Sequence, residues 1–310
     1  MSTAPTSTVR VASAPVSFGI FELTLDRTPL VEPDRLLDLV AGAGYEGVDL
    51  GPVGYLGDVR RLPARLSARS LRLAGGWVPL SFGDAGNLRE ELGCLEATLD
   101  LFVAAAGDRS DFAPKPTLAD AGSAARRRTL TRPGPSRPGM DDKDWSRFAA
   151  RVDEVAGRVR TRGLEPTFHH HAGTAVESPE EIDRLLALTD IGLCLDVGHL
   201  LVAGGDPVEA MSRWGDRINH LHVKDCRREV VDGIESEGAP VGEIWSRRAF
   251  CALGTGDLDL DGFLAAVRAS AYSGWMVIEQ DVFTRPGDTA ESIAAEQAAN
   301  LAELRRVGLP

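Results

Sequence analysis

The chain has 310 residues, an apolar content of 43%, a charged content of 26% and a formal net charge of −12. These values are typical of a globular protein rather than a disordered chain. The negative charge disfavours nucleic-acid binding, which depends on Lys and Arg neutralising phosphates. No apolar run reaches the roughly 20 residues that cross a bilayer, and residues 1–10 lack the basic start and apolar segment of a secretory signal. We therefore expect a cytoplasmic protein that binds neither nucleic acid nor membranes.

The four cysteines, Cys94, Cys194, Cys226 and Cys251, are far apart and form no Cys-x-x-Cys pair. This spacing indicates neither a zinc knuckle nor a disulfide framework. We expect buried, reduced thiols and no thiolate among the ligands of a metal.

Short apolar segments alternate with longer amphipathic segments along the chain. Strands are predicted at residues 9–14, 46–50, 71–76, about 110–113, 164–170, 191–196, 217–222 and 275–279. Helices are predicted at residues 34–43, 58–69, 88–106, 144–162, 179–188, 207–214, 260–270 and 290–307. Ser178, Pro179 and Glu181 form the pattern of a capping box at the start of one of these helices. This alternation predicts a single α/β domain over residues 1–310, a (β/α)8 TIM barrel.

Two long loops interrupt the alternation, at about 114–142 and 226–256. The first is rich in Arg, Pro and Gly. It either contributes Arg127 or Arg128 to the binding of an anionic substrate or is a solvated loop. Both loops follow strands, so in a barrel they rise from the C-terminal face, where active sites are built.

The run 167-TFHHHAGTAVES-178 contains three successive histidines. Because successive side chains of a strand point to opposite faces, only His169 and His171 can point in the same direction, while His170 faces elsewhere. The residue nearer the end of the strand reaches further into the barrel mouth. This argument favours His171 as a metal ligand and leaves His169 either to contact substrate or to support the ligands from behind.

Imidazole and carboxylate groups occur at the ends of four successive predicted strands, as His171, Asp196, His222 and Glu279. In a closed barrel these ends converge on one mouth. Within the pair formed by His220 and His222, the same argument from strand position favours His222. Two nitrogen and two carboxylate ligands suit Mn2+ or Co2+, and also Zn2+ or Mg2+, with positions left for substrate. We therefore expect a divalent metal held by these four residues.

Further candidates for catalysis or substrate binding lie near the same strand ends. Glu177 is a candidate general base or a helix cap, and His199 can hydrogen-bond a substrate hydroxyl or carbonyl. Lys224 and Asp225 supply a charge-stabilising donor and a proton acceptor, or form a surface ion pair. Trp77 offers an apolar wall to the ring of a sugar or cyclitol, or packs inside the barrel.

The ordered segments 168-FHHHAGTAVES-178, 194-CLDVGHLLVAGGDP-207, 217-RINHLHVKDCR-227, 254-GTGDLDL-260 and 274-GWMVIEQD-281 carry a family resemblance. They resemble the sugar isomerase/epimerase superfamily with the xylose-isomerase-like barrel, and within it the inosose dehydratase group. Many members of the superfamily use Glu, Asp, His and Glu as metal ligands, and Asp196, His222 and Glu279 match the last three. At the first position this chain has histidine, as the dehydratase-like pattern does.

The resemblance implies a metal-dependent lyase that dehydrates a keto-cyclitol such as 2-keto-myo-inositol through an enediolate, with a divalent cation as Lewis acid. It also implies Glu177 or Glu279 as the base that removes the α-proton, and His199 or His169 as the acid that protonates the departing hydroxyl. An isomerase or epimerase of a keto sugar shares the enediolate and is the alternative function. A noncatalytic binding barrel is the alternative from another class. The expected partner is a small polyol or keto sugar, and the sequence leaves assembly into a homo-oligomer open.

Overall fold

The computed structural model of the chain describes residues 8–24, 27–107, 111–131 and 139–309. Its main sheet is parallel, with the strand order β3-β2-β1-β11-β8-β7-β6-β5-β4. The strands are β1 (Val9–Ser13), β2 (Gly47–Val48), β3 (Arg72–Leu73), β4 (Gly75–Leu80), β5 (Lys115–Asp120), β6 (Thr167–His169), β7 (Gly192–Asp196), β8 (Ile218–Val223) and β11 (Gly274–Ile278).

The sheet closes into a barrel because β3 and β4, at the two ends of the strand order, are one chain segment interrupted only at Ala74. The Ala74 amide donates to Val48 O at 3.0 Å, and the Leu50 amide donates to Gly75 O at 2.9 Å, so β2 remains bonded to this segment across the interruption. Counting β3 and β4 as one strand gives the predicted eight barrel positions among the described residues. The prediction of a TIM barrel is confirmed.

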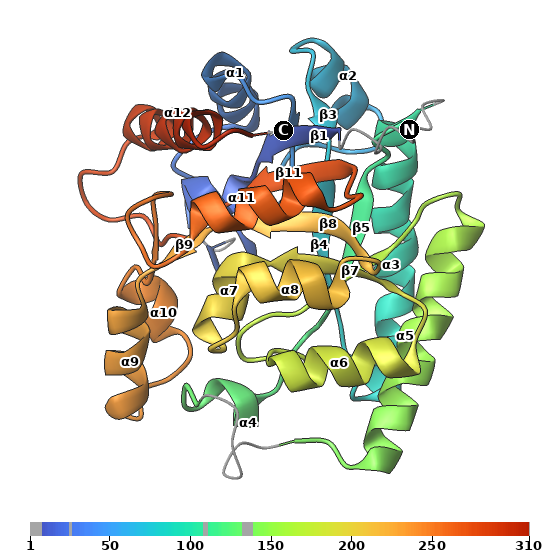
Figure 1. Ribbon diagram of the computed structural model, residues 1–310. Helices are drawn as coiled ribbons and strands as arrows, with labels where there is room; N and C mark the ends of the chain where they lie inside the picture. Colours follow the sequence, from blue (N-terminus) through green and yellow to red (C-terminus); the bar gives the residue numbers. More distant parts are fainter. Residues whose placement is uncertain (1–7, 25–26, 108–110, 132–138, 310) are drawn as a thin grey trace, which may run out of the picture.

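Helices surround the strands, as Figure 1 shows. Those at the predicted places are α1 (Pro33–Ala43), α2 (Arg61–Ser67), α3 (Ala85–Ala106), α5 (Asp142–Thr161), α6 (Pro179–Leu188), α8 (Pro207–Trp214), α11 (Leu260–Ala269) and α12 (Ala290–Arg306). The predicted capping box at α6 is present: Ser178 Oγ accepts from the Glu181 amide at 3.3 Å, and Glu181 Oε2 accepts from the Ser178 amide at 3.0 Å. This cap fixes where the loop after β6 turns into α6.

The alternation of side chains along each strand separates two apolar regions. Met276 and Ile278 on β11 belong to the large core between strands and helices. Trp275 and Val277 belong to a small separate cluster with Ala12, and Ala12 is the register partner of Val277 on β1. Since alternate residues face opposite sides of a strand, the small cluster lies on the inner face of the barrel. Only a few apolar side chains fill that face, which leaves its C-terminal end to polar groups.

The fourth strand differs from its prediction. Residue 110 lies outside the described residues, residues 111–113 do not form a strand, and the strand is β5, at Lys115–Asp120. Its residues after Lys115 are all buried, so no alternation of polar and apolar residues marks the strand in the sequence. The predicted loop at about 114–142 therefore begins only after β5, and it also contains the short helix α4 (Ala124–Arg127). Residues 132–138 of that loop lie outside the described part.

The second predicted loop, at about 226–256, contains regular structure. It includes α9 (Arg228–Ser236), α10 (Glu243–Ser246) and an antiparallel pair, β9 (Asp225–Cys226) and β10 (Phe250–Cys251). In Figure 1, α9 and α10 lie together at the side of the barrel. Further short elements are the 3-10 turns η1 (Pro15–Phe18) and η2 (Glu22–Thr24), and α7 (Val197–Val202), which directly follows β7.

Candidate active site

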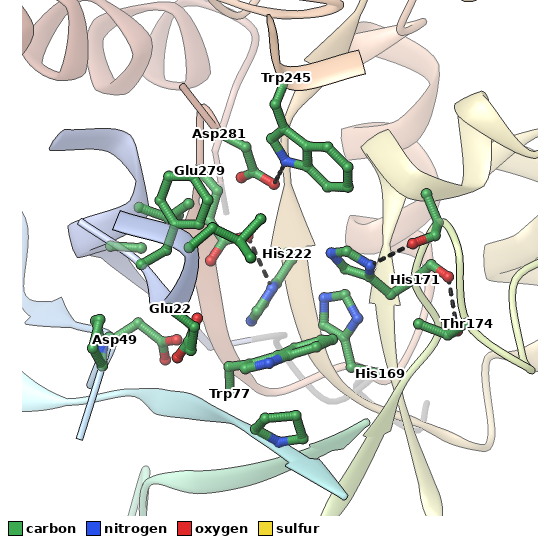
Figure 2. A pocket seen from close by; sticks show the side chains of 18 of the residues that line it. Glu22, Asp49, Trp77, His169, His171, Thr174, His222, Trp245, Glu279 and Asp281 are labelled. Atoms are coloured by element: carbon green, nitrogen blue, oxygen red, sulfur yellow. Dashed lines mark hydrogen bonds and ion pairs between the residues drawn. The ribbon is translucent and has the colours of Figure 1, made fainter. Parts of the chain in front are cut away.

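A cavity of about 460 Å³ opens at the C-terminal ends of the barrel strands. This is the face at which TIM barrels build their active sites. Figure 2 shows polar and aromatic side chains pointing into the cavity from several strands and loops. Those that carry chemistry are Asp49, Trp77, His169, His171, His222, Lys224, Trp245, Glu279 and Asp281.

Asp196, His222 and Glu279 are brought together from three neighbouring strand ends. One ligand atom from each residue lies within 4.8 Å of those of the other two, and all three side chains are buried. His222 Nδ1 is 3.1 Å from Glu279 Oε2 and 3.7 Å from Asp196 Oδ2. Asp196 and His222 are register partners on β7 and β8, so strand pairing alone holds them side by side. The structure thus assembles three of the four groups that the strand ends predict.

His169 and His171 occupy different places. His169 Nε2 is 3.2 Å from Asp196 Oδ2, and its ring centroid is 4.9 Å from that of His222. His171 instead lies with His199 and Asp281, at a ring distance of 3.8 Å from His199. β6 ends at His169, so the backbone has already left the strand at His171. The argument from strand position that favoured His171 does not extend to a residue in the loop, and His169 is the imidazole beside the predicted ligands.

Lys224 is buried among carboxylates rather than paired at the surface. Its Nζ is 3.0 Å from Asp196 Oδ2, 2.8 Å from Glu279 Oε2 and 3.0 Å from Asp281 Oδ1. Burial alone lowers the pKa of Lys224, but the three carboxylates outweigh it and raise this pKa well above its usual range. Lys224 therefore keeps its positive charge inside the site.

Gly198 makes room for the Lys224 side chain. A Cβ at position 198 would overlap Lys224 Cγ, because the lysine stem passes directly over the glycine. Gly198 lies in α7, between Val197 and His199 and two residues after Asp196. Its small size is therefore part of what positions the ammonium group.

Electrostatic interactions separate His222 from the other histidines of the cavity. Burial is the main cause that lowers the pKa of His169, His171 and His199, so these rings are neutral. Burial alone would also lower the pKa of His222, but Cys194 and Glu279 outweigh it and raise this pKa well above the usual value. Burial alone would raise the pKa of Glu279, but His222 and Lys224 outweigh it and lower this pKa.

Two residues expected to act on substrate have other surroundings. Both carboxylate oxygens of Asp225 accept backbone hydrogen bonds, from the amides of Cys226, Gly254, Gly256 and Leu258 at 2.8–2.9 Å. Asp225 therefore organises the loop before α11 and is not among the residues that line the cavity, and its expected role as a proton acceptor stays a prediction. Glu177 Oε2 accepts from the Gly173 amide at 3.0 Å and is buried beneath its own loop, outside the cavity lining.

Of the two remaining candidates, Trp77 lines the cavity and His199 does not. His199 is fully buried behind His171, with Nε2 at 3.7 Å from Asp281 Oδ2, and it is not part of the cavity lining. Trp77 does line the cavity, and its ring packs at 5.1 Å from His169 and 4.8 Å from His171. An indole at this place offers the apolar wall that the sequence suggested.

Several groups at the site were missed from the sequence. Asp281 accepts from Lys224 and, at 3.3 Å, from Trp245 Nε1, and burial raises the pKa of Asp281 to about 6. Asp49, at the end of β2, lines the cavity, and burial raises its pKa to about 7. Asp49 lies near the end of the predicted strand 46–50 and Asp281 follows the predicted strand 275–279, so the rule that found Asp196 could have found them. Trp245 is in the long insertion, and no local signal pointed to it.

The two long loops meet above the cavity. The amide of Val241 donates to Arg127 O at 3.1 Å, and the amide of Leu130 donates to Ala239 O at 2.8 Å. Arg127 lines the cavity, whereas Arg126 forms an ion pair with Glu181. Of the loop arginines at 126–128, Arg127 is thus the one that can reach a bound molecule.

The residues around His222 fit a divalent cation. Neither ring nitrogen of His222 makes a hydrogen bond of good geometry in the described part of the chain, and the same holds for His169 Nδ1. Unpaired buried nitrogens are costly unless another partner satisfies them. Imidazole nitrogens together with the oxygens of Asp196 and Glu279 are a donor set that Mn2+, Co2+ and Zn2+ accept.

The fold and the arrangement of these strand ends agree with the family comparison. Residues 37–304 match the family of xylose isomerase-like TIM barrels, and the chain belongs to this family. The resemblance noted in the sequence is confirmed at this level.

The chain is similar to two named proteins and to one solved structure, among others. An inosose dehydratase of Geobacillus kaustophilus (strain HTA426) is 28% identical over 260 residues, covering 80% of this chain and 80% of that protein. The rhizopine catabolism protein MocC of Rhizobium meliloti is 29% identical over 278 residues, covering 88% and 82%. The crystal structure of IOLI protein with a binding zinc atom superposes with a TM-score of 0.68 at 14% identity, covering 95% and 97% of the two chains.

No helix in the described ranges is both long enough and apolar enough to span a membrane.

Proposed function

We propose that the protein is a metal-dependent lyase that removes water from a keto-cyclitol resembling 2-keto-myo-inositol. The observation that carries this proposal is the cluster of Asp196, His222 and Glu279, with Lys224 among the same carboxylates, at the base of the cavity. The named relatives at 28–29% identity include inosose dehydratases and support the substrate class. A small polyol or keto sugar is the expected ligand.

The groups that would hold the cation are His169, Asp196, His222 and Glu279. This set replaces His171 by His169, because His169 lies 3.2 Å from Asp196 whereas His171 lies with His199 and Asp281. When bound, a divalent cation supplies Lewis acidity towards a substrate carbonyl. Mn2+, Co2+ and Zn2+ are all compatible with these donors.

Asp281 is the group best placed to move the proton. It lines the cavity, and its pKa, raised by burial to about 6, suits both uptake and release of a proton near neutral pH. In a dehydration, the α-carbon gives its proton to the carboxylate, the electron pair forms the double bond, and the β-hydroxyl leaves. Asp281 returns the proton to the leaving hydroxide, so that one water is lost. Glu279 is the second candidate base, since it also lines the cavity.

Lys224 stabilises the negative charge that develops during this step. Its ammonium group lines the cavity and is held at 3.0 Å from Asp281 Oδ1, so base and donor are positioned together. A fixed cation near a developing oxyanion stabilises the transition state more than the ground state. Trp77 and Trp245 border the space that the substrate ring would occupy.

An isomerase or epimerase of a keto sugar is the alternative, and membership of the xylose isomerase-like family favours it. The same base would return the proton to carbon instead of oxygen. Incubation of the Mn2+- or Co2+-loaded protein with inososes and ketoses in D2O separates the two functions. Loss of water from an inosose supports the lyase, and deuterium uptake into carbon without loss of water supports the alternative. No reaction with any member of the panel, at a metal content verified by elemental analysis, contradicts both.

A further inference from the structure

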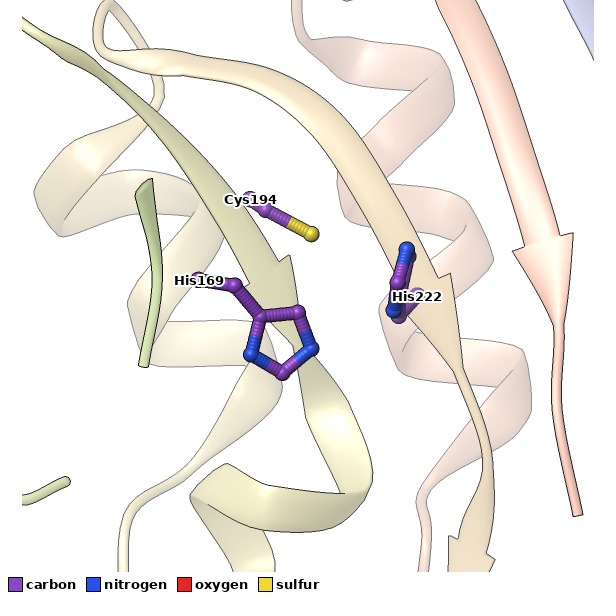
Figure 3. A group of neighbouring side chains, drawn as sticks. All are labelled: His169, Cys194 and His222. Carbon is purple, nitrogen blue, oxygen red and sulfur yellow. The ribbon is translucent and has the colours of Figure 1, made fainter. Parts of the chain in front are cut away.

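We propose that the cation site includes the thiol of Cys194, and that His169, Cys194 and His222 form an inner position selective for a borderline-soft ion, Zn2+ or Co2+. Figure 3 shows the three side chains converging from β6, β7 and β8. This inference rests on the proposed function only in requiring that a divalent cation binds beside His222. It names the class of cation, and it adds a thiolate ligand, which the sequence analysis did not expect.

Strand pairing places the sulfur inside the barrel. Cys194 lies two residues before Asp196 on β7, so both side chains point to the same face. Its register partners are His169 on β6 and His220 on β8. Cys194 is therefore one layer deeper in the barrel than Asp196, directly beneath the ligands already described.

The three groups are within reach of one ion. One ligand atom from each of His169, Cys194 and His222 lies within 4.8 Å of those of the other two, and all three side chains are buried. Their exposed fractions are 2%, 0% and 3%. Within residues 8–309 as described, both ring nitrogens of His222 and one of His169 lack a well-formed hydrogen bond. His222 Nδ1 lies 3.1 Å from Glu279 Oε2, whereas His222 Nε2 and His169 Nδ1 are buried ring nitrogens whose lone pair or proton is still available to a bound ligand.

The inner position also avoids the lysine. Lys224 Nζ is 3.0 Å from Asp196 Oδ2 and 2.8 Å from Glu279 Oε2, so a cation held only by those oxygens would lie close to a second positive charge. None of the three inner ligands is paired with Lys224. Asp196 Oδ2, 3.2 Å from His169 Nε2, can complete the set as a fourth ligand, and it is the one member of that set which also contacts Lys224.

This donor set discriminates between cations. Two imidazoles, a thiolate and a carboxylate match the four-coordinate preference of Zn2+, which Co2+ shares, whereas Mg2+ and Mn2+ favour oxygen ligands. Binding through the thiolate releases the thiol proton to solvent. Mn2+ is left with the carboxylate-rich outer position formed by Asp196, His222 and Glu279.

Cobalt spectroscopy tests this proposal without using activity. The metal-free protein is titrated with Co2+ alone, and we expect a near-ultraviolet sulfur-to-cobalt charge-transfer band that is absent in Cys194→Ser. In competition with a chromophoric chelator, Cys194→Ser is expected to weaken Zn2+ binding by about 10–100-fold, a range that even supporting groups of metal sites reach. Mn2+ binding is expected to change by less than about threefold, since its ligands are oxygens and nitrogen.

Cys226→Ser is the matched control, because Cys226 is also fully buried but lies in β9 and belongs to no group of described side chains that could hold a metal ion. It should keep the band. If wild-type protein binds Co2+ without the band, the thiol is not a ligand and this inference is wrong, while the proposed function stands. If neither Co2+, Zn2+ nor Mn2+ binds, the proposed function fails as well. The wild-type spectrum decides the matter even if Cys194→Ser does not fold.

Discussion

The single positive charge of Lys224 balances the negative charges of the buried carboxylates in the site. Its ammonium group contacts three buried carboxylates, those of Asp196, Glu279 and Asp281. Removing one partner from a buried ionic cluster leaves the others uncompensated, which costs more than the cluster itself contributes. The lysine therefore has a structural role in addition to its proposed role towards substrate.

Lys224→Met should lower the free energy of unfolding of the metal-free protein by about 3–5 kcal/mol, because three buried carboxylates lose their counter-ion. Denaturant unfolding measures this change. Arg213→Met is the control: Arg213 pairs with Asp183 but is 39% exposed, so its loss should cost only about 0–1 kcal/mol. Equal losses in the free energy of unfolding for the two substitutions would show that the buried ion pairs of Lys224 contribute no more to stability than an exposed pair.

Gly198→Ala should displace the lysine, because the added methyl group occupies the space of Lys224 Cγ. We expect a loss of about 1–3 kcal/mol in stability, as for other overpacked buried sites, together with reduced turnover. Gly157→Ala in α5 is the control, since a Cβ there meets no atom within 4 Å. It should instead stabilise the protein by about 0.5–1 kcal/mol. Unaltered stability and turnover in Gly198→Ala would contradict the packing argument.

Among the elements, the ends of β6 and β7 are linked by a hydrogen bond to His170, whose side chain points to the outer face of the barrel. The Asp196 amide donates to His170 Nε2 at 3.2 Å, so the ring must be neutral at that nitrogen. Burial lowers the pKa of His170 to about 3. This histidine therefore holds two strand ends in register only in its neutral form.

The sign of the resulting pH dependence follows from this lowered pKa. Below about pH 6.5 the unfolded chain protonates His170 but the folded chain does not, so stability falls as the pH falls towards about 3. From about pH 7 to about pH 5, His170 should account for a loss of roughly 2 kcal/mol at 1.36 kcal/mol per pKa unit. His170→Gln, which keeps an acceptor, should lose less stability over this interval in thermal unfolding of the metal-free protein. An identical pH profile in the variant would exclude this contribution.

At the scale of the whole molecule, cation binding and folding are linked because the proposed ligands come from β6, β7, β8 and the end of β11. A cation that binds only the folded chain stabilises it by about 2.7 kcal/mol at a free concentration one hundred times its dissociation constant. The ligands are far apart in the sequence, so the unfolded chain cannot gather them.

Removal of metal with a chelator should therefore lower the melting temperature of the wild-type protein, and added Mn2+ or Zn2+ should restore it. In His222→Gln the melting temperature should no longer respond to either ion, because His222 belongs to both proposed ligand positions. Differential scanning calorimetry measures these shifts. A metal-dependent shift that persists in His222→Gln would place the cation elsewhere.

The barrel and the convergence of Asp196, His222 and Glu279 could be predicted from the sequence, because both depend on where strands begin and end, which local periodicity indicates. Strands alternate with helices, and a residue at the end of a parallel strand must reach the barrel mouth whatever the loops do. The strand at Lys115–Asp120 escaped the same reasoning since burial on both faces removes the alternation.

The tertiary structure alone decided which of the two histidines lies beside Asp196, that Lys224 is buried among three carboxylates, and that Cys194 lies within reach of His169 and His222. His171 left the strand direction because the chain turns after His169, and Asp225 was taken by backbone amides of residues 254–258. These outcomes depend on where loops turn and on contacts between residues distant along the chain. No pattern within a single segment contains that information.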